Sequence, residues 1–151
     1  MKAKIKRYLK EVLIFGVLLL LISSVVSLYR TSSMKIDDDV CQRGADIVYF
    51  WATWCPVCKL TSPNVERVSS SFDILGIAVG SEADLSVEEY MHKHRLHFKN
   101  IGDSDATMAA KYGIHVFPTF VFCKEGHVKM LETGYMSSIG LWLRAWVISL
   151  Y

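Results

Sequence analysis

The sequence predicts an α/β protein in which a mixed sheet with flanking helices is preceded by one N-terminal transmembrane helix. Three observations support this prediction. An uncharged apolar run covers residues 12–28. Short β-branched and aromatic runs then alternate with helix-length segments from residue 46 onward. The last two of these runs flank a tight turn, which indicates an antiparallel hairpin beside strands joined by crossover helices.

Length and composition restrict the class of protein. With 151 residues, 52% of them hydrophobic, the chain has room for one domain of ordinary size and is too apolar to be disordered. Residues 1–11 contain five basic side chains and one acidic side chain, and the net charge of the whole chain is only +2. The remainder is therefore slightly acidic, which argues against a nucleic-acid partner. Four cysteines are too few for a small domain held together by disulfides.

The apolar run is expected to be a membrane anchor. As a helix, residues 12–28 would extend about 26 Å, just short of the roughly 30 Å hydrocarbon core. Basic residues are concentrated before the run, so residues 1–11 should stay in the cytoplasm and the rest of the chain should be exported. A cleaved signal peptide is the alternative, but no A-x-A-like cleavage site follows the run. We then expect a linker over 29–45 and a folded domain over 46–151.

The first half of the domain alternates strands and helices. Residues 47–51 (IVYFW) are typical of a strand buried on both faces. A proline at position 56 suits the first turn of a helix, which we expect over 56–70. Residues 72–79 (FDILGIAV) predict a second strand, ended by a glycine. A polar helix over 84–95 and a short strand over 98–101 complete this half.

The second half ends with the hairpin and a helix. Residues 105–112 predict a short helix, because a glycine follows in the position that favours a C-cap. The apolar runs 119–123 and 128–133 are expected to pair across the turn formed by residues 124–127. Residues 137–150 predict the final helix.

The residues that point to chemistry are Cys55 and Cys58, in the sequence Cys-Pro-Val-Cys. Cys55 is expected at the start of the helix that follows the first strand, with Cys58 one turn later on the same face. Free backbone N–H groups and the helix dipole would stabilise a thiolate at Cys55 and make it the attacking sulfur. Cys58, deeper in the helix, would resolve a mixed disulfide. An inert structural disulfide and a Cu(I)-binding dithiol are the alternatives.

The segment YFWATWCPVC resembles the active-site segment of thioredoxin-like proteins. Residues 117–119 (Phe-Pro-Thr) resemble the cis-proline loop that faces the dithiol in that family, and the resemblance extends over residues 46–149. The N-terminal anchor, residues 103–118 and the C-terminal TGYMSSIGLWLRAW resemble the suppressor-of-copper-sensitivity D group. That group lies among the exported, membrane-anchored oxidoreductases of the TlpA and ResA kind.

The resemblance implies a thiol–disulfide oxidoreductase in the bacterial inner membrane, with one membrane pass and a periplasmic domain. Cys55 would attack, Cys58 would resolve, and Pro118 would be the cis-proline beside them. No cofactor is implied; the partners would be protein thiols or disulfides and a membrane-embedded electron donor or acceptor. A link to copper tolerance follows from the same resemblance. Tyr49 stands where cytoplasmic thioredoxin has a buried acid, so a different group or water must assist Cys58. A Cu(I)-binding module and a redoxin-type antioxidant activity are the alternative functions.

Two further cysteines lie outside the motif. Cys41 precedes the first strand and Cys123 ends the strand after Pro118. In the family these two strands are antiparallel neighbours, so a second disulfide is one interpretation in an oxidising compartment. A buried free Cys123 with Cys41 in a loop is the other.

Histidines and tryptophans of two helices have structural interpretations. His92, His94 and His97 are spaced as on a solvated helix face, not as a set of metal ligands. Trp142 and Trp146 in the last helix are expected to pack in the core or against another helix, with contact to a membrane as the weaker alternative.

Overall fold

The computed structural model describes residues 36–81 and 87–150, together with the isolated positions 10, 11, 14 and 18, which are helical. The chain divides into two compact units, Met1–Met34 and Lys35–Tyr151. The predicted anchor, residues 12–28, lies outside the described residues except at positions 14 and 18. Among the residues described, no helix is both long enough and apolar enough to cross a bilayer.

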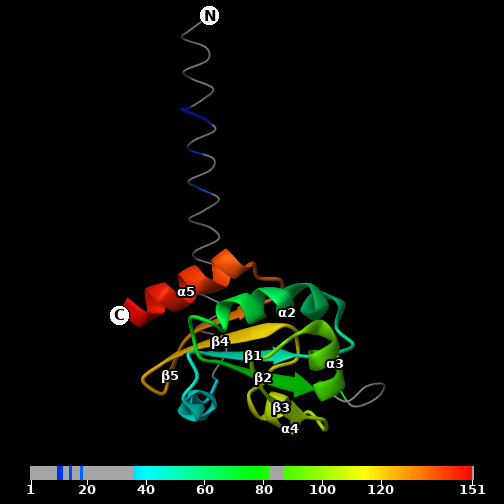
Figure 1. Cartoon of the computed structure of the whole chain (residues 1–151). Coiled ribbons are helices and arrows are strands. Elements are labelled where there is room, and N and C mark those ends of the chain that lie inside the picture. The colour runs from blue at the N-terminus through cyan, green and yellow to red at the C-terminus, as the bar shows by residue number, and fades with distance from the viewer. Residues whose placement is uncertain (1–9, 12–13, 15–17, 19–35, 82–86, 151) are drawn as a thin grey trace, which may run out of the picture. The chain divides into compact units, whose positions relative to one another are not determined.

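The second unit is built on a five-stranded mixed sheet with the order β3-β2-β1-β4-β5 (Figure 1). Strand β1 pairs in parallel with β2, and β2 pairs in parallel with β3, whereas β1–β4 and β4–β5 are antiparallel. The mixed α/β sheet predicted from the sequence is thus confirmed. The strands are β1 (Ile47–Trp51), β2 (Ile74–Val79), β3 (Lys99–Asp103), β4 (Thr119–Lys124) and β5 (His127–Thr133).

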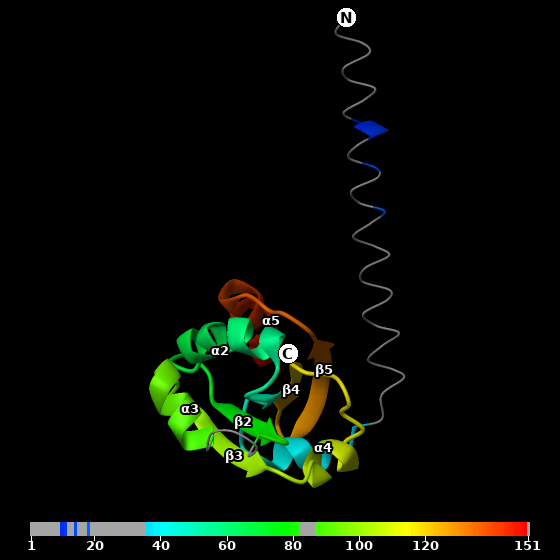
Figure 2. The same ribbon diagram turned by 90° about the vertical axis from the view of Figure 1, so that its right-hand side faces the viewer.

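Helices cover both faces of this sheet (Figures 1 and 2). On one face, β1 directs Tyr49 and Trp51 into a core shared with α2, α3 and α5. On the other face, Val48 and Phe50 of the same strand pack against η1 and α4. Successive side chains of a strand point to opposite faces, so all five residues of β1 are buried. The helices are η1 (a 3₁₀-helix, Asp38–Arg43), α2 (Pro56–Val68), α3 (Val87–His94), α4 (Thr107–Lys111) and α5 (Ser138–Leu150).

The hairpin between β4 and β5 has a two-residue turn. Glu125 and Gly126 both have positive φ, 54° and 77°, which is the backbone of a type I′ turn. The twist of this turn matches that of the paired strands, and each strand therefore extends one residue further into the turn than the sequence predicts.

The segment predicted as a linker, residues 29–45, includes η1. The carboxylate of Asp38 accepts the backbone N–H of Val128 at 2.7 Å, and Val40 is fully buried. Cys41 forms a disulfide with Cys123, with 5.5 Å between their Cα atoms. Of the two interpretations of these cysteines, the structure therefore has the disulfide, and residues from 36 onward belong to the folded unit.

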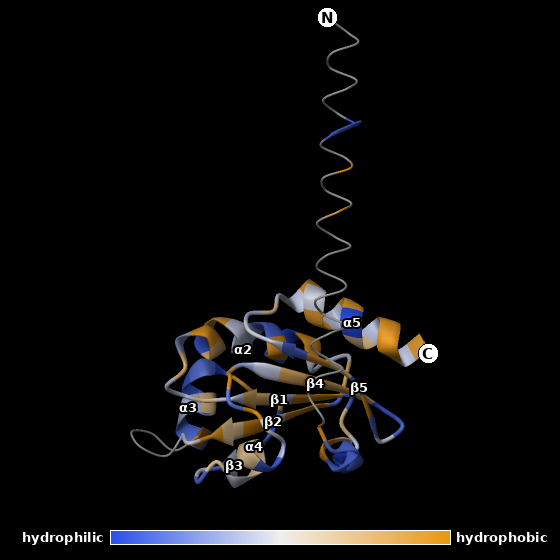
Figure 3. Cartoon of the chain, turned by 180° about the vertical axis from the view of Figure 1, so that it is seen from behind, coloured by the Kyte–Doolittle hydropathy of each residue, from blue (hydrophilic) through white to orange (hydrophobic). Residues whose placement is uncertain are grey.

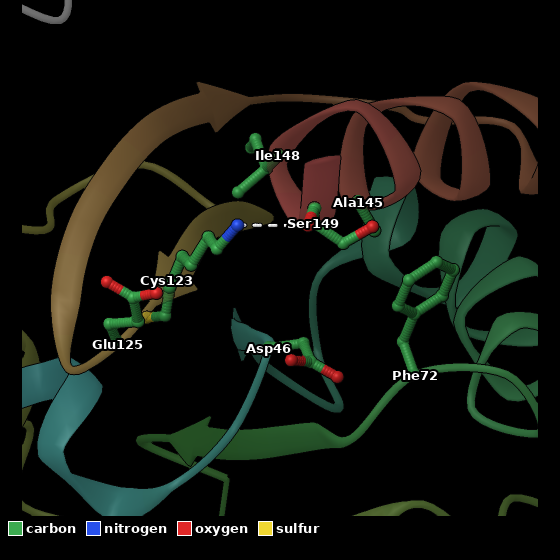
Figure 4. Close-up of a pocket in the computed structure, with 8 residues that line it drawn as sticks. Asp46, Phe72, Cys123, Glu125, Ala145, Ile148 and Ser149 are labelled. Atoms are coloured by element: carbon green, nitrogen blue, oxygen red, sulfur yellow. Dashed lines mark hydrogen bonds between the residues drawn. The ribbon is translucent and has the colours of Figure 1, made fainter. Parts of the chain in front are cut away.

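The disulfide lies at the end of the sheet where β1 begins. The backbone N–H of Cys123 donates to the carbonyl of Asp46, the residue immediately before β1. A cavity of about 150 Å³ opens there, and the ammonium of Lys124 crosses it to donate to the carbonyl of Ser149 at 2.9 Å (Figure 4). The bond satisfies a carbonyl in the last turn of α5 and ties this helix to β4. Because Cys55 follows the opposite end of β1, the two cysteine pairs are separated by the length of that strand.

Close contacts at Gly76 in β2 make this position sensitive to substitution. A Cβ atom here would lie 2.6 Å from the side-chain oxygen of Asn100 and 2.7 Å from the ring of Phe98. Replacing Gly76 by alanine would force apart the bond of 2.9 Å that Trp51 Nε1 donates to Asn100. We expect Gly76→Ala to lower the free energy of unfolding by about 1–3 kcal/mol, measured by urea denaturation. Gly102→Ala is the control, since nothing lies within 4 Å of its Cβ position; equal urea midpoints for the two variants would contradict this packing.

Candidate active site

Cys55 occupies the N-cap of α2. Its backbone is extended (φ −81°, ψ 116°), and Pro56 begins the helix. The sulfur of Cys55 accepts the backbone N–H of Cys58 at 3.2 Å. This N–H is one of the donors that a helix start leaves without a backbone acceptor. The expected placement of Cys55 at a helix start is therefore what the structure shows.

The loop between β1 and α2 is fixed by the end of β2. The backbone N–H of Thr53 donates to Ser81 Oγ at 3.2 Å, and Trp54 Nε1 donates to the carbonyl of Gly80 at 2.9 Å. Trp54 is held by this bond although 57% of its surface is exposed. The positions that hold the loop, Gly80 and Ser81, were interpreted from the sequence only as the end of a strand, since no motif marks them.

The loop before β4 forms the opposite wall of the site. The Phe117–Pro118 peptide bond is cis, as the resemblance implies. The carbonyl oxygen of Phe117 lies 3.7 Å from the sulfur of Cys55, within reach of its S–H. The Phe117 ring packs edge-on against Trp54, with 5.9 Å between ring centroids. The structure thus brings together the three predicted site residues, because Cys55 and Cys58 share α2 and Pro118 adjoins the carbonyl that faces Cys55.

The two sulfurs differ in accessibility and in protonation. Both cysteines are free thiols, and Cys55 retains 5% exposure while Cys58 has none. Burial raises the pKa of the Cys58 thiol far above its ordinary value, and its hydrogen bond with Cys55 acts in the same direction. Cys55 is therefore the more accessible thiol, and Cys58 is protonated at neutral pH.

This protonation makes the reduced protein less stable at alkaline pH. Above about pH 8.5, Cys58 in the unfolded chain loses its proton, whereas folded Cys58 keeps it. The folded state then holds more protons than the unfolded state, so the free energy of unfolding falls as pH rises, by up to about 1.4 kcal/mol per pH unit. We expect this fall between about pH 8.5 and 10 in urea titrations of the reduced protein. Cys58→Ala should lack that contribution; the same slope in both proteins would contradict the assignment to Cys58.

A buried hydrogen-bonded chain lies beneath Cys58. Ser62, one helical turn further along α2, donates to the Cys58 carbonyl at 2.9 Å, and the hydroxyl of Tyr49 lies 3.1 Å from Ser62 Oγ. Because the hydroxyl proton of Ser62 is donated to the Cys58 carbonyl, Tyr49 is the donor in the bond to Ser62. Burial raises the pKa of Tyr49, so it remains a neutral phenol. Tyr49 therefore supplies no charge at the position of the thioredoxin acid. Ser62 was not predicted from the sequence, and its i, i+4 spacing from Cys58 is the one signal that could have found it.

A cavity of about 320 Å³ adjoins the site between the Trp54–Phe117 pair and α4. Its wall includes Ala109 and Ala110 of α4, and His115 of the loop before Pro118. These small side chains leave an apolar space beside the Trp54–Phe117 pair. Nothing in the sequence marked the alanines, because small apolar residues in a short helix are common packing residues.

The histidines do not form a cluster with other metal-ligand side chains. His97 Nδ1 lies 3.0 Å from Glu66 Oε1, and His94 packs against the ring of Tyr90. Within residues 36–81 and 87–150, no group of three or more His, Cys, Asp or Glu side chains is placed to hold a metal ion.

Comparisons with known proteins agree with this geometry. The thioredoxin-like protein of Haemophilus influenzae is 31% identical over 104 residues, which are 68% of this chain and 62% of that protein. The thiol-disulfide oxidoreductase ResA of Halalkalibacterium halodurans is 27% identical over 93 residues, 58% of this chain and 53% of that protein. The chain thus spans little more than half the length of these relatives.

Solved structures of exported oxidoreductases share the fold. A secreted disulfide oxidoreductase of Mycobacterium tuberculosis, homologous to E. coli DsbE, superposes with a TM-score of 0.59 at 28% identity. The superposition covers 67% of this chain and 79% of that protein. The sequence profile of the AhpC/TSA family matches residues 33–130, more than half of the chain. The chain therefore belongs to the AhpC/TSA family and has the thioredoxin-like fold.

Proposed function

We propose that this protein is a thiol–disulfide oxidoreductase whose redox centre is Cys55 and Cys58. The observation that carries the proposal is the position of Cys55. Its sulfur is the more accessible of the two, accepts the first-turn N–H of Cys58, and faces the Phe117 carbonyl. A sulfur in this position can attack a substrate disulfide, and a second sulfur one turn along the helix can displace whatever it binds.

The reaction balances without any cofactor. The Cys55 thiolate attacks one sulfur of a substrate disulfide; a mixed disulfide forms and the departing substrate sulfur takes up a proton. Cys58 then gives up its proton and attacks Cys55, which releases the second substrate sulfur as a thiol. The substrate gains two electrons, and Cys55 and Cys58 become a disulfide. The same steps in reverse oxidise a substrate dithiol.

The high pKa of Cys58 affects the second step most. Attack by Cys58 requires its thiolate, which burial disfavours.

Pro118 would contribute to substrate binding by exposing backbone polar groups of Phe117 to an extended substrate segment beside Cys55.

The location and partners form part of the proposal. The uncharged run at residues 12–28 would anchor the chain in the bacterial inner membrane and leave Lys35–Tyr151 in the periplasm. The similarity to a secreted oxidoreductase supports an exported domain. A membrane-embedded protein would then return electrons to Cys55 and Cys58, which favours a reductase acting on protein disulfides. The link to copper tolerance rests on the resemblance of the sequence segments alone.

The direct test is reduction of insulin by dithiothreitol in the presence of the full-length protein. We expect the wild-type protein to accelerate the reaction, because Cys55 exchanges faster than an ordinary thiol. The matched control is Cys41→Ala/Cys123→Ala, which removes the other cysteine pair and should retain the acceleration. A rate equal to that of dithiothreitol alone would refute the proposal.

The same preparations distinguish the alternatives. A dithiol that takes up one Cu(I) tightly but accelerates no exchange would be a copper-binding module. Consumption of peroxide without acceleration of disulfide exchange would indicate an antioxidant activity. Either result would replace the proposed function.

A further inference from the structure

Helix α5 carries two apolar stripes, of which one is buried against the domain and the other is largely exposed. Leu141 and Ala145 are buried against α2 and the sheet, with Ile148 partly buried beside them. The second stripe follows the spacing i, i+3, i+4, i+7, i+8, i+11, which is that of an amphipathic helix face. Its six members are 42–73% exposed; we call them the outward stripe: Ile139, Trp142, Leu143, Trp146, Val147 and Leu150.

The exposure corrects one prediction from the sequence. Trp142 and Trp146 were expected in the core or in helix packing, yet they are 42% and 43% exposed. Their rings stack on each other, with 5.9 Å between centroids, and only Trp142 also contacts the ring of Phe72. Figure 3 shows α5 mainly in orange and white, with one blue stretch. A contiguous exposed face of six large apolar side chains indicates an interaction surface.

The charges around the outward stripe suit a lipid surface. Helix α5 contains no acidic residue, and its single charged side chain is Arg144, which lies 3.6 Å from Glu132. Arg67 of α2 lines a cavity of about 330 Å³ together with Ile139 and Trp142. Tryptophan rings with neighbouring arginines are typical of segments that lie at the boundary between lipid headgroups and acyl chains.

Chain length keeps the whole domain close to the bilayer, although the tether enters at η1, which packs on the sheet face opposite α5. Only seven residues, 29–35, separate the apolar run 12–28 from the first described residue of the domain. Fully extended, they reach at most about 25 Å. A tether of this length gives a high effective concentration of the domain at the membrane, so a weak affinity of the outward stripe suffices.

We propose that the outward stripe of α5 lies on the surface of the lipid bilayer. The inference rests on the proposed anchoring of residues 12–28 and goes beyond the dithiol chemistry. A second copy of the chain is the competing occupant, but the paired tryptophans and the arginines beside them favour lipid. Contact through α5 would restrict how the domain turns above the membrane in which its electron donor is proposed to lie.

The tryptophans provide the measurement. All four of them lie in the domain, at positions 51, 54, 142 and 146, so insertion of residues 12–28 adds no tryptophan signal. The full-length protein is incorporated into vesicles of phosphatidylcholine and phosphatidylglycerol, with and without brominated phosphatidylcholine as a quencher. We expect quenching in the wild-type protein and in Trp54→Phe, and its loss in Trp142→Phe/Trp146→Phe.

A second pair of variants keeps the reporters. Leu143→Glu/Val147→Glu places charge on the outward stripe at half-exposed positions and should abolish the quenching of Trp142 and Trp146. Leu60→Glu makes the same kind of change at a 68% exposed position of α2 and should leave the quenching intact. Circular dichroism confirms that each variant is folded.

Vesicle flotation separates the possible failures. A protein that floats with the vesicles but shows no quenching of Trp142 and Trp146 overturns the inference and leaves the anchor standing. A protein that does not float overturns both the membrane anchor and the lipid contact of α5. Insulin reduction still tests the dithiol independently. Cross-linking of α5 to a second copy without quenching would assign the outward stripe to a dimer.

Discussion

Replacing Cys55 by serine is expected to abolish the acceleration of insulin reduction, by a factor of at least about 10³. The serine hydroxyl keeps the hydrogen bond from the N–H of Cys58 but is a far weaker nucleophile than a thiolate. The fold should be unchanged, because the cap of α2 remains satisfied. The measurement is the initial rate of insulin precipitation relative to dithiothreitol alone.

Cys58→Ser is the matched partner of that variant. Without the second sulfur, Cys55 still attacks but cannot be displaced, so a mixed disulfide with the substrate should accumulate. Non-reducing electrophoresis with peptide mapping identifies the cysteine that carries the adduct. In Cys55→Ser, the adduct could form only on Cys58. If it formed there as fast as the adduct forms on Cys55 in Cys58→Ser, the assigned roles would be contradicted.

Removing the disulfide between Cys41 and Cys123 is expected to have the largest effect on stability. These cysteines are 82 residues apart in sequence, so the bond strongly restricts the unfolded chain. Loop-closure entropy for that separation corresponds to about 4.5 kcal/mol at 25 °C, and measured effects are usually about 2–4 kcal/mol. We expect Cys41→Ala/Cys123→Ala to lose stability in that range, measured by urea denaturation.

The two cysteine pairs lie at opposite ends of β1, which makes their functions separable. The Cys41→Ala/Cys123→Ala variant should keep its exchange activity under conditions in which it is folded. Cys55→Ser should keep the urea midpoint of the reduced wild-type protein. If Cys41→Ala/Cys123→Ala were as stable as the wild-type protein, η1 would be held by noncovalent contacts alone, such as the bond from the Val128 N–H to the carboxylate of Asp38.

Strands β1, β2 and β4 were predictable from the sequence because each contains a continuous apolar run. β1 has the predicted bounds, since a strand buried on both faces contains no polar residue to blur its ends. The hairpin followed from Glu125-Gly126, which can adopt the two positive φ angles that the turn needs.

The elements that escaped prediction depend on distant contacts. η1 has the sequence DDVCQR, with only Val40 and Cys41 apolar, and is held by Cys123 and by Val128, which is 90 residues from Asp38. No local pattern reports such contacts. The outward stripe of α5 was misjudged for a related reason, because two apolar stripes on one helix do not reveal which of them faces the core.

The candidate site was predictable in its sulfurs and not in its surroundings. Spacing placed Cys55 and Cys58 on one helix face, and resemblance supplied the proline loop. Gly80 and Ser81 hold the loop that carries Cys55, and Tyr49 bonds to Ser62. These groups meet only once the sheet has folded. Ordinary polar residues of this kind carry no signal in a single sequence.

Equilibrium redox titration of the full-length protein tests the central claim most directly. The protein is incubated in glutathione buffers of graded potential, alkylated, and mapped by mass spectrometry. We predict that Cys55 and Cys58 interconvert between dithiol and intramolecular disulfide as one reversible two-electron couple, while Cys41–Cys123 stays oxidised throughout. If Cys55 and Cys58 stayed reduced at every potential, or paired with Cys41 or Cys123 instead, the assignment of a redox centre to α2 would be contradicted.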